Sequence, residues 1–373
     1  DPPAVWNGVD VLKRDGLELL KGKRVGLITN QTGIDRNRVA TIDVLKGMRG
    51  VKLVALFSPE HGIRGGLDQA KIDDSIDRRT GLPVYSLYGE RRVPSDEQMS
   101  KVDVLVFDIQ DIGCRFYTYI ATLKGCMKVA AEKGKPFVVL DRVNPIGGVK
   151  VEGPTKPDKL DFVACHPIPL RHGMTTGELA KMFAEEDKLT LDLHVVKAEG
   201  WRREEWFDAT GLPWQNPSPN MRSLTAATLY PGIGIVEFAI SVGRGTDTPF
   251  ELLGAPYIKD RRLASELNRL GLRGVRFIPE QFTPASSVFE KQRCGGVRVI
   301  ITDRETFEPV KTGLAIASTI NTLYPGKMDH VKLNRLMQDD AAMKRLGDWR
   351  AVAQRWAAES AAFSERRKPF LLY

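Results

Sequence analysis

The stretch VDVLVF at residues 102–107 is a short apolar run with the length of a buried strand. Apolar residues at helical spacing follow it from Phe116 to Lys133, and Gly134 stands where such a helix ends. A second apolar run, FVVL at residues 137–140, begins directly after Pro136. A strand, a helix and a second strand in this order predict a parallel sheet with helices on both faces.

The same alternation continues outward from this unit. RVGLIT at Arg24–Thr29 and VKLVALF at Val51–Phe57 predict two earlier strands, separated by a helix over Arg38–Met48. A helix from Thr176 to about Asp187 and a strand at Leu193–Lys197 follow later. We therefore expect a Rossmann-like α/β domain. Neither GxGxxG after the first strand nor GxxxxGK[ST] occurs, which argues against a sugar-nucleotide enzyme.

The residue pattern changes after the proline-dense segment PWQNPSP at residues 213–219. Beyond it we predict strands at Val275–Ile278 and Gly296–Ile301, with helical segments around them and toward the C-terminus. The predicted organisation is a Rossmann-like catalytic domain at residues 1–213 and a smaller α+β domain at residues 214–373. The active site is expected in the cleft between the two domains.

The composition of the 373-residue chain is that of a globular protein with about two domains, because 42% of the residues are hydrophobic. The longest apolar runs are strand-sized, so we expect no membrane span. A net charge of +8 suits an anionic partner. The basic residues are scattered and no nucleic-acid module is present, so nucleic acid is not an expected partner. The four cysteines lack zinc-ligand spacing, and we predict free thiols and neither a metal nor another cofactor.

Polar residues follow the predicted strands at their carboxyl ends, which is the edge where open parallel sheets bind ligands. We therefore expect these side chains to share one active-site edge. The residues concerned are Asn30, Glu60, His61, Asp108, Asp111 and Asn144.

Glu60 and His61 are the strongest candidates for catalytic residues. A carboxylate beside an imidazole on a glycine-flanked loop suits general acid–base catalysis. The alternative is a loop carboxylate that accepts backbone N–H bonds, next to a solvated histidine. A metal site built from Glu60, His61 and Asp108 is a third interpretation, although no HExxH spacing supports it.

The residues that follow Asp108 allow more than one interpretation. Asp108 and Asp111 can ligate a metal or assist a second acid, and Asp111 can instead cap the following helix. Arg115 can bind a carboxylate in a bidentate fork or pair with Asp111. Tyr117 or Tyr119 either lines a cleft or is a surface aromatic. Glu178, by contrast, is expected to be structural, within a capping arrangement.

Two polar loops in the second half are further candidates for ligand contacts. Asn220 follows the stiff segment at 217–219, and Arg244 lies in a glycine-rich loop. Loops of this kind hold a ligand against a sheet edge or are simple turns.

Together these stretches resemble the exo-β-N-acetylmuramidases of the NamZ type, a family of peptidoglycan glycosidases long known only as a domain of unknown function. The resemblance runs over nearly the whole chain. It rests on the following segments: GVD at 8–10, ITNQTG at 28–33, FSPEHGIRG at 57–65, YSLYG at 85–89, FDIQDIG at 107–113, RFYTY at 115–119, DRVNP at 141–145, PSPNM at 217–221 and GRGT at 243–246.

The resemblance implies the release of terminal N-acetylmuramic acid from the non-reducing end of peptidoglycan fragments, with Glu60 as general acid. His61 would tune Glu60 or bind the sugar. Asp108 is the first choice for the second carboxylate or for orienting the 2-acetamido group, with Asp111 and Glu237 in reserve.

The substrate's lactyl carboxylate requires a cation, for which Arg64, Arg115 and Arg244 are candidates. Tyr117 or Tyr119 is expected to stack on the sugar, and Tyr117 is counted among the substrate-binding residues. We further count Asn30, Asp111, Asn144, Asn220 and Glu237 among the substrate-binding residues.

The expected partner is a muropeptide or a disaccharide of N-acetylmuramic acid and N-acetylglucosamine. For such a substrate we expect a periplasmic or extracellular protein, and we expect its signal peptide to be absent from this sequence. Two other classes of protein stay open: a non-catalytic muropeptide-binding protein, and a metal-dependent hydrolase that uses Glu60, His61 and Asp108.

Overall fold

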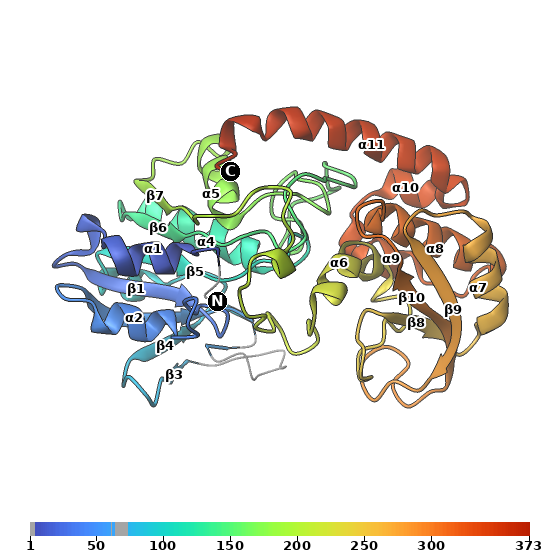
Figure 1. Cartoon of the computed structure of the whole chain (residues 1–373), viewed down its shortest axis with the longest axis horizontal. Coiled ribbons are helices and arrows are strands. Elements are labelled where there is room, and N and C mark those ends of the chain that lie inside the picture. Colours follow the sequence, from blue (N-terminus) through green and yellow to red (C-terminus); the bar gives the residue numbers. More distant parts are fainter. Residues whose placement is uncertain (1–3, 61, 64–73) are drawn as a thin grey trace.

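The protein was analysed as a computed structural model, which describes residues 4–60, 62–63 and 74–373. Within these residues, a seven-stranded sheet occupies the first half of the chain and a three-stranded sheet the second (Figure 1). The predicted α/β class, with a Rossmann-like sheet and a smaller α+β part, is confirmed.

The larger sheet has the strand order β3-β4-β2-β1-β5-β6-β7, and its strands are parallel except for β3, which runs antiparallel to β4. The strands are β1 (Arg24–Thr29), β2 (Lys52–Ser58), β3 (Ser75–Ile76), β4 (Pro83–Ser86), β5 (Val104–Asp108), β6 (Phe137–Leu140) and β7 (Leu193–Val196). The pairing register places Thr29 beside Asp108 and Ile28 beside Phe57. The polar residues after β1, β2 and β5 therefore emerge at one edge.

Helices cover both faces of this sheet because alternate strand side chains point to opposite sides. Side chains of α1 and α2 pack on one face, whereas α4 and α5 pack on the other. The helices are α1 (Gly8–Asp15), α2 (Thr41–Gly47), α3 (Asp96–Ser100), α4 (Tyr119–Glu132) and α5 (Thr176–Glu186). Thr175 and Glu178 form the expected capping box at the start of α5.

One helix begins later than its sequence pattern predicts. We expected a helix from Phe116, but α4 starts at Tyr119 with Thr118 as its N-cap residue. The preceding backbone is bound elsewhere, because the Arg115 N–H donates to the Leu170 carbonyl. The apolar spacing is helical across the whole segment, so only this tertiary contact sets the boundary.

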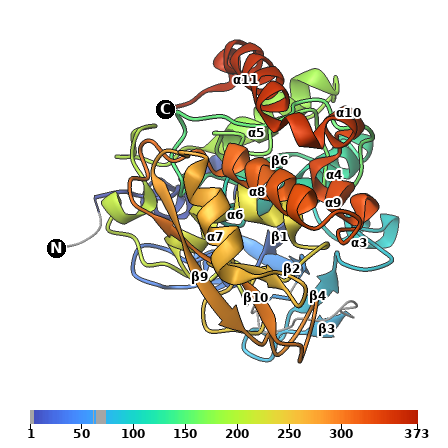
Figure 2. The same ribbon diagram turned by 90° about the vertical axis from the view of Figure 1, so that its right-hand side faces the viewer.

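The second half is built on an antiparallel sheet in the order β8-β10-β9, and α7 and α8 pack against it (Figure 2). Its strands are β8 (Leu252–Ala255), β9 (Val275–Phe282) and β10 (Cys294–Ile301). Its helices are α6 (Leu224–Ile233), α7 (Asp260–Arg269), α8 (Pro309–Leu323), α9 (His330–Met337), α10 (Asp340–Lys344) and α11 (Trp349–Arg366). Short 3₁₀ turns lie at Glu18–Leu20, Phe207–Ala209, Gly234–Val236, Leu346–Asp348 and Lys368–Phe370.

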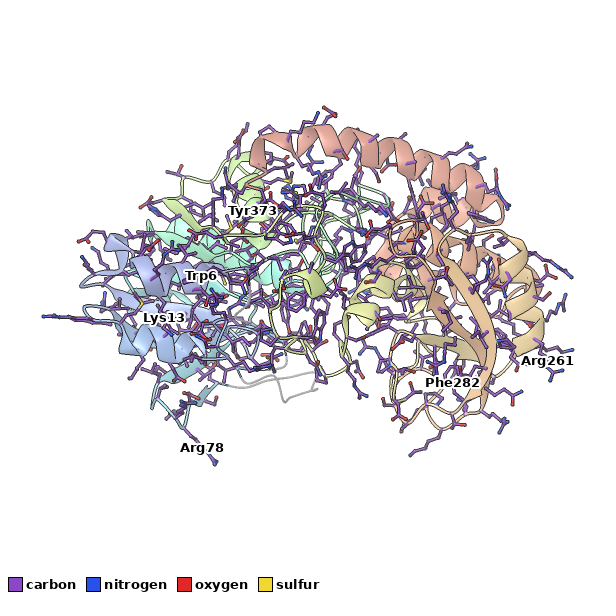
Figure 3. All side chains as sticks on the ribbon, in the orientation of Figure 1. Trp6, Lys13, Arg78, Arg261, Phe282 and Tyr373 are labelled. Atoms are coloured by element: carbon purple, nitrogen blue, oxygen red, sulfur yellow. The ribbon has the colours of Figure 1, made fainter. Side chains whose placement is uncertain are left out.

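The long helix α11 runs from the second half back to the first (Figure 1). Phe363, near its end, packs into the core formed by α4 and α5, and Arg366 forms an ion pair with Glu186. The last residue, Tyr373, lies over the first half (Figure 3) and donates a hydrogen bond to the buried carboxylate of Asp141 at 2.7 Å. The two halves are therefore joined by packed side chains.

A search of the described residues finds no helix that is both long and apolar enough to cross a membrane.

Candidate active site

Glu60 stands two residues beyond the end of β2 and is partly buried. The Thr118 hydroxyl donates to Glu60 Oε2 at 3.1 Å. Thr118 occupies the N-cap position of α4 but makes no capping bond with its side chain. Its hydroxyl is therefore committed to orienting one oxygen of this carboxylate.

Tyr119 lies near Glu60, and its ring belongs to a cluster of three tyrosines that reaches the second half of the chain. The rings of Tyr117 and Tyr119 meet edge to face at 5.1 Å, and those of Tyr117 and Tyr230 at 5.9 Å. The Tyr119 hydroxyl donates to the Pro217 carbonyl. Burial, together with the nearby Glu60 charge, raises the pKa of Tyr119, and burial also raises the pKa values of Tyr117 and Tyr230. These hydroxyls therefore stay protonated and can donate hydrogen bonds.

Glu237 and Arg244 lie at the far end of the tyrosine cluster. Tyr230 donates to Glu237 Oε1 at 2.9 Å, and Arg244 Nη2 donates to Oε2 at 2.9 Å. The Arg244 guanidinium also lies 5.1 Å from the centre of the Phe250 ring. The Glu237 side chain is 7% exposed and that of Arg244 is 29% exposed, so the arginine is the member of the pair that reaches solvent.

The predicted catalytic residue Asp108 is a fully buried ion-pair partner. Arg142 donates to its two oxygens at 2.5 and 2.9 Å, and the Thr41 hydroxyl donates to Oδ2 at 2.5 Å. A carboxylate held by three donors at the end of β5 is not placed to attack a sugar. We interpret Asp108 as a positioning residue that holds the strand ends together.

Asp111 does not cap a helix, so that interpretation is wrong. Its Oδ2 accepts from the Gly113 N–H at 2.9 Å and from His172 Nε2 at 3.0 Å. His172 is fully buried, and its Nδ1 accepts from the Met174 N–H at 3.1 Å, which fixes the proton on Nε2. Sequence reasoning assigned no role to His172, since nothing local marks its partner.

Arg115 was predicted to bind the substrate carboxylate or to pair with Asp111, and the structure contradicts both. Its guanidinium is 1% exposed and donates to the carbonyls of Pro154, Ile168, Leu336 and Met337. Burial lowers its pKa to about 10. The residue ties the two halves of the chain together from within.

Asn144 is likewise a structural residue rather than a ligand contact. Its Nδ2 donates to the Met174 carbonyl at 3.0 Å and its Oδ1 accepts from the Ile146 N–H. Asn30, in contrast, uses only part of its amide: Oδ1 accepts from Thr32, whereas Nδ2 makes no hydrogen bond within the described residues. Asn220 is partly buried in the loop that follows Pro217. His61 and Arg64 lie outside the described residues.

Thr118 and Tyr230 are site residues that sequence reasoning missed. Thr118 sits within the quoted motif RFYTY, so its place at the start of a helix was the available signal. Tyr230 lies inside the apolar helix α6, and no local pattern distinguishes it from a core residue.

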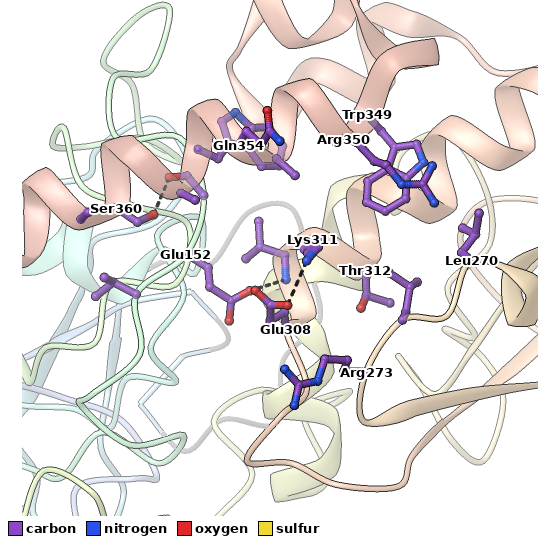
Figure 4. Close-up of a pocket in the computed structure, with 18 of the residues that line it drawn as sticks. Glu152, Leu270, Arg273, Glu308, Lys311, Thr312, Trp349, Arg350, Gln354 and Ser360 are labelled. Atoms are coloured by element: carbon purple, nitrogen blue, oxygen red, sulfur yellow. Dashed lines mark hydrogen bonds and ion pairs between the residues drawn. The ribbon is translucent and has the colours of Figure 1, made fainter.

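A cavity of about 730 Å³ lies away from Glu60, beneath α11 (Figure 4). Two of its acidic side chains are bound within the protein: Glu152 pairs with Arg171 and accepts from the Val310 N–H, and Glu308 pairs with Lys311. None of the predicted site residues lines this cavity. In the part of the chain that the structure describes, no group of three or more His, Cys, Asp or Glu side chains is arranged to hold a metal ion.

Comparison with known proteins is consistent across the whole chain. Residues 25–225 match the N-terminal model of exo-β-N-acetylmuramidase NamZ, and residues 228–373 match its C-terminal model. The chain is 49% identical to the peptidoglycan β-N-acetylmuramidase NamZ of Bacillus subtilis strain 168 over 326 residues, which cover 87% of this chain and 79% of that protein.

Two crystal structures of DUF1343 family proteins from Bacteroides fragilis NCTC 9343 share the fold. One has a TM-score of 0.93 and 38% identity, with full coverage of both chains. The other has a TM-score of 0.78 and 28% identity, with 99% of each chain covered. The matching family models and the relative from Bacillus subtilis show that this chain belongs to the exo-β-N-acetylmuramidase NamZ family.

Proposed function

We propose that this protein is an exo-acting glycoside hydrolase that releases terminal β-linked N-acetylmuramic acid from the non-reducing end of peptidoglycan fragments. The observation that carries the proposal is the place of Glu60, oriented by Thr118 near the buried Tyr119, in a chain 49% identical to a peptidoglycan β-N-acetylmuramidase. A partly buried glutamate at a strand end suits the proton donor that cleavage of a glycosidic bond requires.

Glu60 acts as the general acid in this proposal. Its carboxyl group protonates the leaving oxygen as the bond to the anomeric carbon breaks, and water supplies the group that replaces it. The Thr118 hydroxyl fixes the orientation of this carboxyl group by donating to Oε2. Asp108 supports the site by holding the strand end through Arg142 rather than by touching the sugar.

Arg244 is the described arginine best placed for the lactyl carboxylate. The buried Arg115 guanidinium donates its hydrogen bonds to backbone carbonyls. The Arg244 side chain, in contrast, reaches solvent at the edge of the tyrosine cluster. Glu237 fixes the orientation of the guanidinium through two donor atoms. A guanidinium held in this way at the solvent edge has the charge and the planar geometry that recognise a carboxylate.

The test uses a chromogenic β-N-acetylmuramide and the matching β-N-acetylglucosaminide. We expect cleavage of the muramide, and a loss of about 10²–10⁴-fold in Glu60→Gln, the usual contribution of a general acid. Glu97→Gln, which changes an exposed glutamate of α3 in the same way, is the matched control and retains the wild-type rate. Cleavage of the glucosaminide alone, or near-normal turnover by Glu60→Gln, would contradict the proposal.

The same assay separates the other two classes of protein. A muropeptide-binding protein binds without turnover, and a metal-dependent hydrolase loses its activity in the presence of a chelator. The arginine-bound state of Asp108 gives no support to a metal site that includes it.

We also propose that the protein works in the periplasm or outside the cell, in the recycling of cell-wall fragments. The support is the substrate class, because peptidoglycan lies outside the cytoplasmic membrane. Fractionation of cells that express the natural gene tests this, and accumulation in the cytoplasm would contradict it.

A further inference from the structure

Three buried polar atoms without a partner belong to residues at the strand ends and at the start of α4. Within the described part of the chain, Asn30 Nδ2, Asp111 Oδ1 and the Tyr117 hydroxyl are shielded from solvent and make no hydrogen bond. Such atoms are rare in folded proteins because each loses its bonds to water without replacement. Three of them at one site therefore indicate a partner that the protein itself does not supply.

Hydrogen bonds and a ring contact place the three residues in one region. The Thr32 hydroxyl links Asn30 Oδ1, at 2.5 Å, to the N–H of Gln110, at 2.9 Å, which directly precedes Asp111, and the ring of Tyr117 lies 5.1 Å from that of Tyr119. Tyr117 and Asn30 lie close enough to stabilise the ionised form of Tyr119, although neither reaches the geometry of a hydrogen bond, and the charges of Asp111 and Glu60 act on it as well. The three orphaned atoms and the proposed general acid thus share one neighbourhood. Glu60 and Tyr117 are partly exposed, so the region reaches the protein surface at these two residues.

The hydrogen-bonding character of each atom is fixed by its other contacts. Asn30 Oδ1 accepts from the Thr32 N–H, so Nδ2 is the donor that remains. Asp111 Oδ2 accepts from Gly113 and His172, so Oδ1 is an acceptor held in place. The buried Tyr117 hydroxyl stays protonated and donates. The site therefore offers two donors and one acceptor.

We propose that Asn30, Asp111 and Tyr117 form the pocket that recognises the 2-acetamido group of the sugar. Asp111 Oδ1 accepts from the acetamido N–H, and Asn30 Nδ2 and the Tyr117 hydroxyl donate to its carbonyl oxygen. The assignment rests on the proposed function and deepens it: Asp111 and not Asp108 orients the acetamido group. A secondary amide offers one donor and one acceptor that takes two bonds, which is the complement of these three atoms.

The experiment compares two substrates in several variants. The substrates are chromogenic 3-O-lactyl β-glycosides that carry either an acetamido or a hydroxyl group at C2. The wild-type protein is expected to prefer the acetamido substrate by at least about 100-fold in kcat/KM, because the hydroxyl analogue leaves buried polar groups unpaired.

Asp111→Asn tests whether the pocket needs a hydrogen-bond acceptor at the position of Oδ1. Gly113 and His172 keep the side-chain oxygen on their side, so an amide nitrogen replaces Oδ1 and faces the acetamido N–H. We expect kcat/KM on the acetamido substrate to fall about 10–100-fold, the effect of losing a hydrogen bond to a charged group. The rate on the hydroxyl analogue should change less than about 3-fold. Tyr117→Phe removes one donor with little change of shape and is expected to lower the same preference.

Tyr257→Phe is the matched control. Its hydroxyl is also buried without a partner among the described residues, but it lies in the second half against Tyr324 and Phe289. The substrate preference of this variant is expected to equal that of the wild-type protein.

The outcomes decide between the alternatives. If Asp111→Asn and Tyr117→Phe lower kcat/KM by the same factor for both substrates, the three atoms bind only structural water and the proposal is overturned. If Asp111→Asn does not fold, Tyr117→Phe decides alone. If the wild-type protein cleaves neither substrate nor the muramide above, the proposed function fails and the pocket assignment fails with it; normal cleavage without a change in preference overturns the pocket alone.

Discussion

Replacing Asp108 by asparagine separates a positioning role from a catalytic one. The carboxylate has no exposed surface and the Arg142 side chain is 4% exposed. Asparagine keeps one oxygen for three donors and leaves the guanidinium without a counter-charge. Removal of one partner from a buried ion pair costs about 3–5 kcal/mol. We therefore expect Asp108→Asn to lower the free energy of unfolding by about 3–5 kcal/mol.

The assay is urea-induced unfolding followed by tryptophan fluorescence, together with kcat of the folded protein measured well below the transition. Asp103→Asn is the control, because Asp103 forms its ion pair with Arg24 at the surface and should matter much less. The double variant Asp108→Asn/Arg142→Met should be more stable than the sum of the single losses predicts, since no unpaired charge stays buried. Unchanged stability combined with a loss of activity of about 10²-fold or more would refute the positioning role.

Three further predictions concern stability. Arg115→Met should lower the free energy of unfolding by at least about 3 kcal/mol, because carbonyls from both halves lose charge-assisted hydrogen bonds; calorimetry that shows an unchanged transition would contradict this. Burial, with Lys124 nearby, lowers the pKa of His166 to about 4, so the folded protein binds fewer protons than the unfolded chain between pH 6.5 and 4. Stability should fall by about 3 kcal/mol as the pH drops through this window, and His166→Asn should flatten the curve of unfolding free energy against pH. Gly113→Ala should cost about 1–3 kcal/mol in thermal unfolding, because φ is +85° and the new Cβ would lie 2.7 Å from Asn144 Oδ1; an unchanged melting temperature would refute the strain.

Much of the fold could be predicted from the local pattern of apolar residues in the sequence. The apolar runs at 24–29, 102–107 and 137–140 became β1, β5 and β6 with shifts of at most two residues. The position of Glu60 beyond a strand end was also predictable, since parallel strands deliver their carboxyl ends to a common edge. The late start of α4 was not, because the contact that delays it comes from Leu170.

The roles of the polar residues depended on partners distant in the chain. Arg115 and Asn144 look like ligand contacts in sequence, yet their partners at Leu336, Met337 and Met174 satisfy them inside the fold. Asp111 shows the opposite case, in which one oxygen stays without a partner. A polar side chain in the sequence offers hydrogen bonds, but whether a ligand can receive them depends on which ones folding has already used.

The amino-acid sequence thus sufficed for the alternation of strands and helices, the absence of a phosphate-binding loop and the edge at which the site lies, because each depends on neighbours within a few residues. The choice between binding, positioning and catalysis at that edge came from the packed chain. It depends on burial and on hydrogen-bond partners that folding brings together from segments up to 222 residues apart, as for Arg115 and Met337.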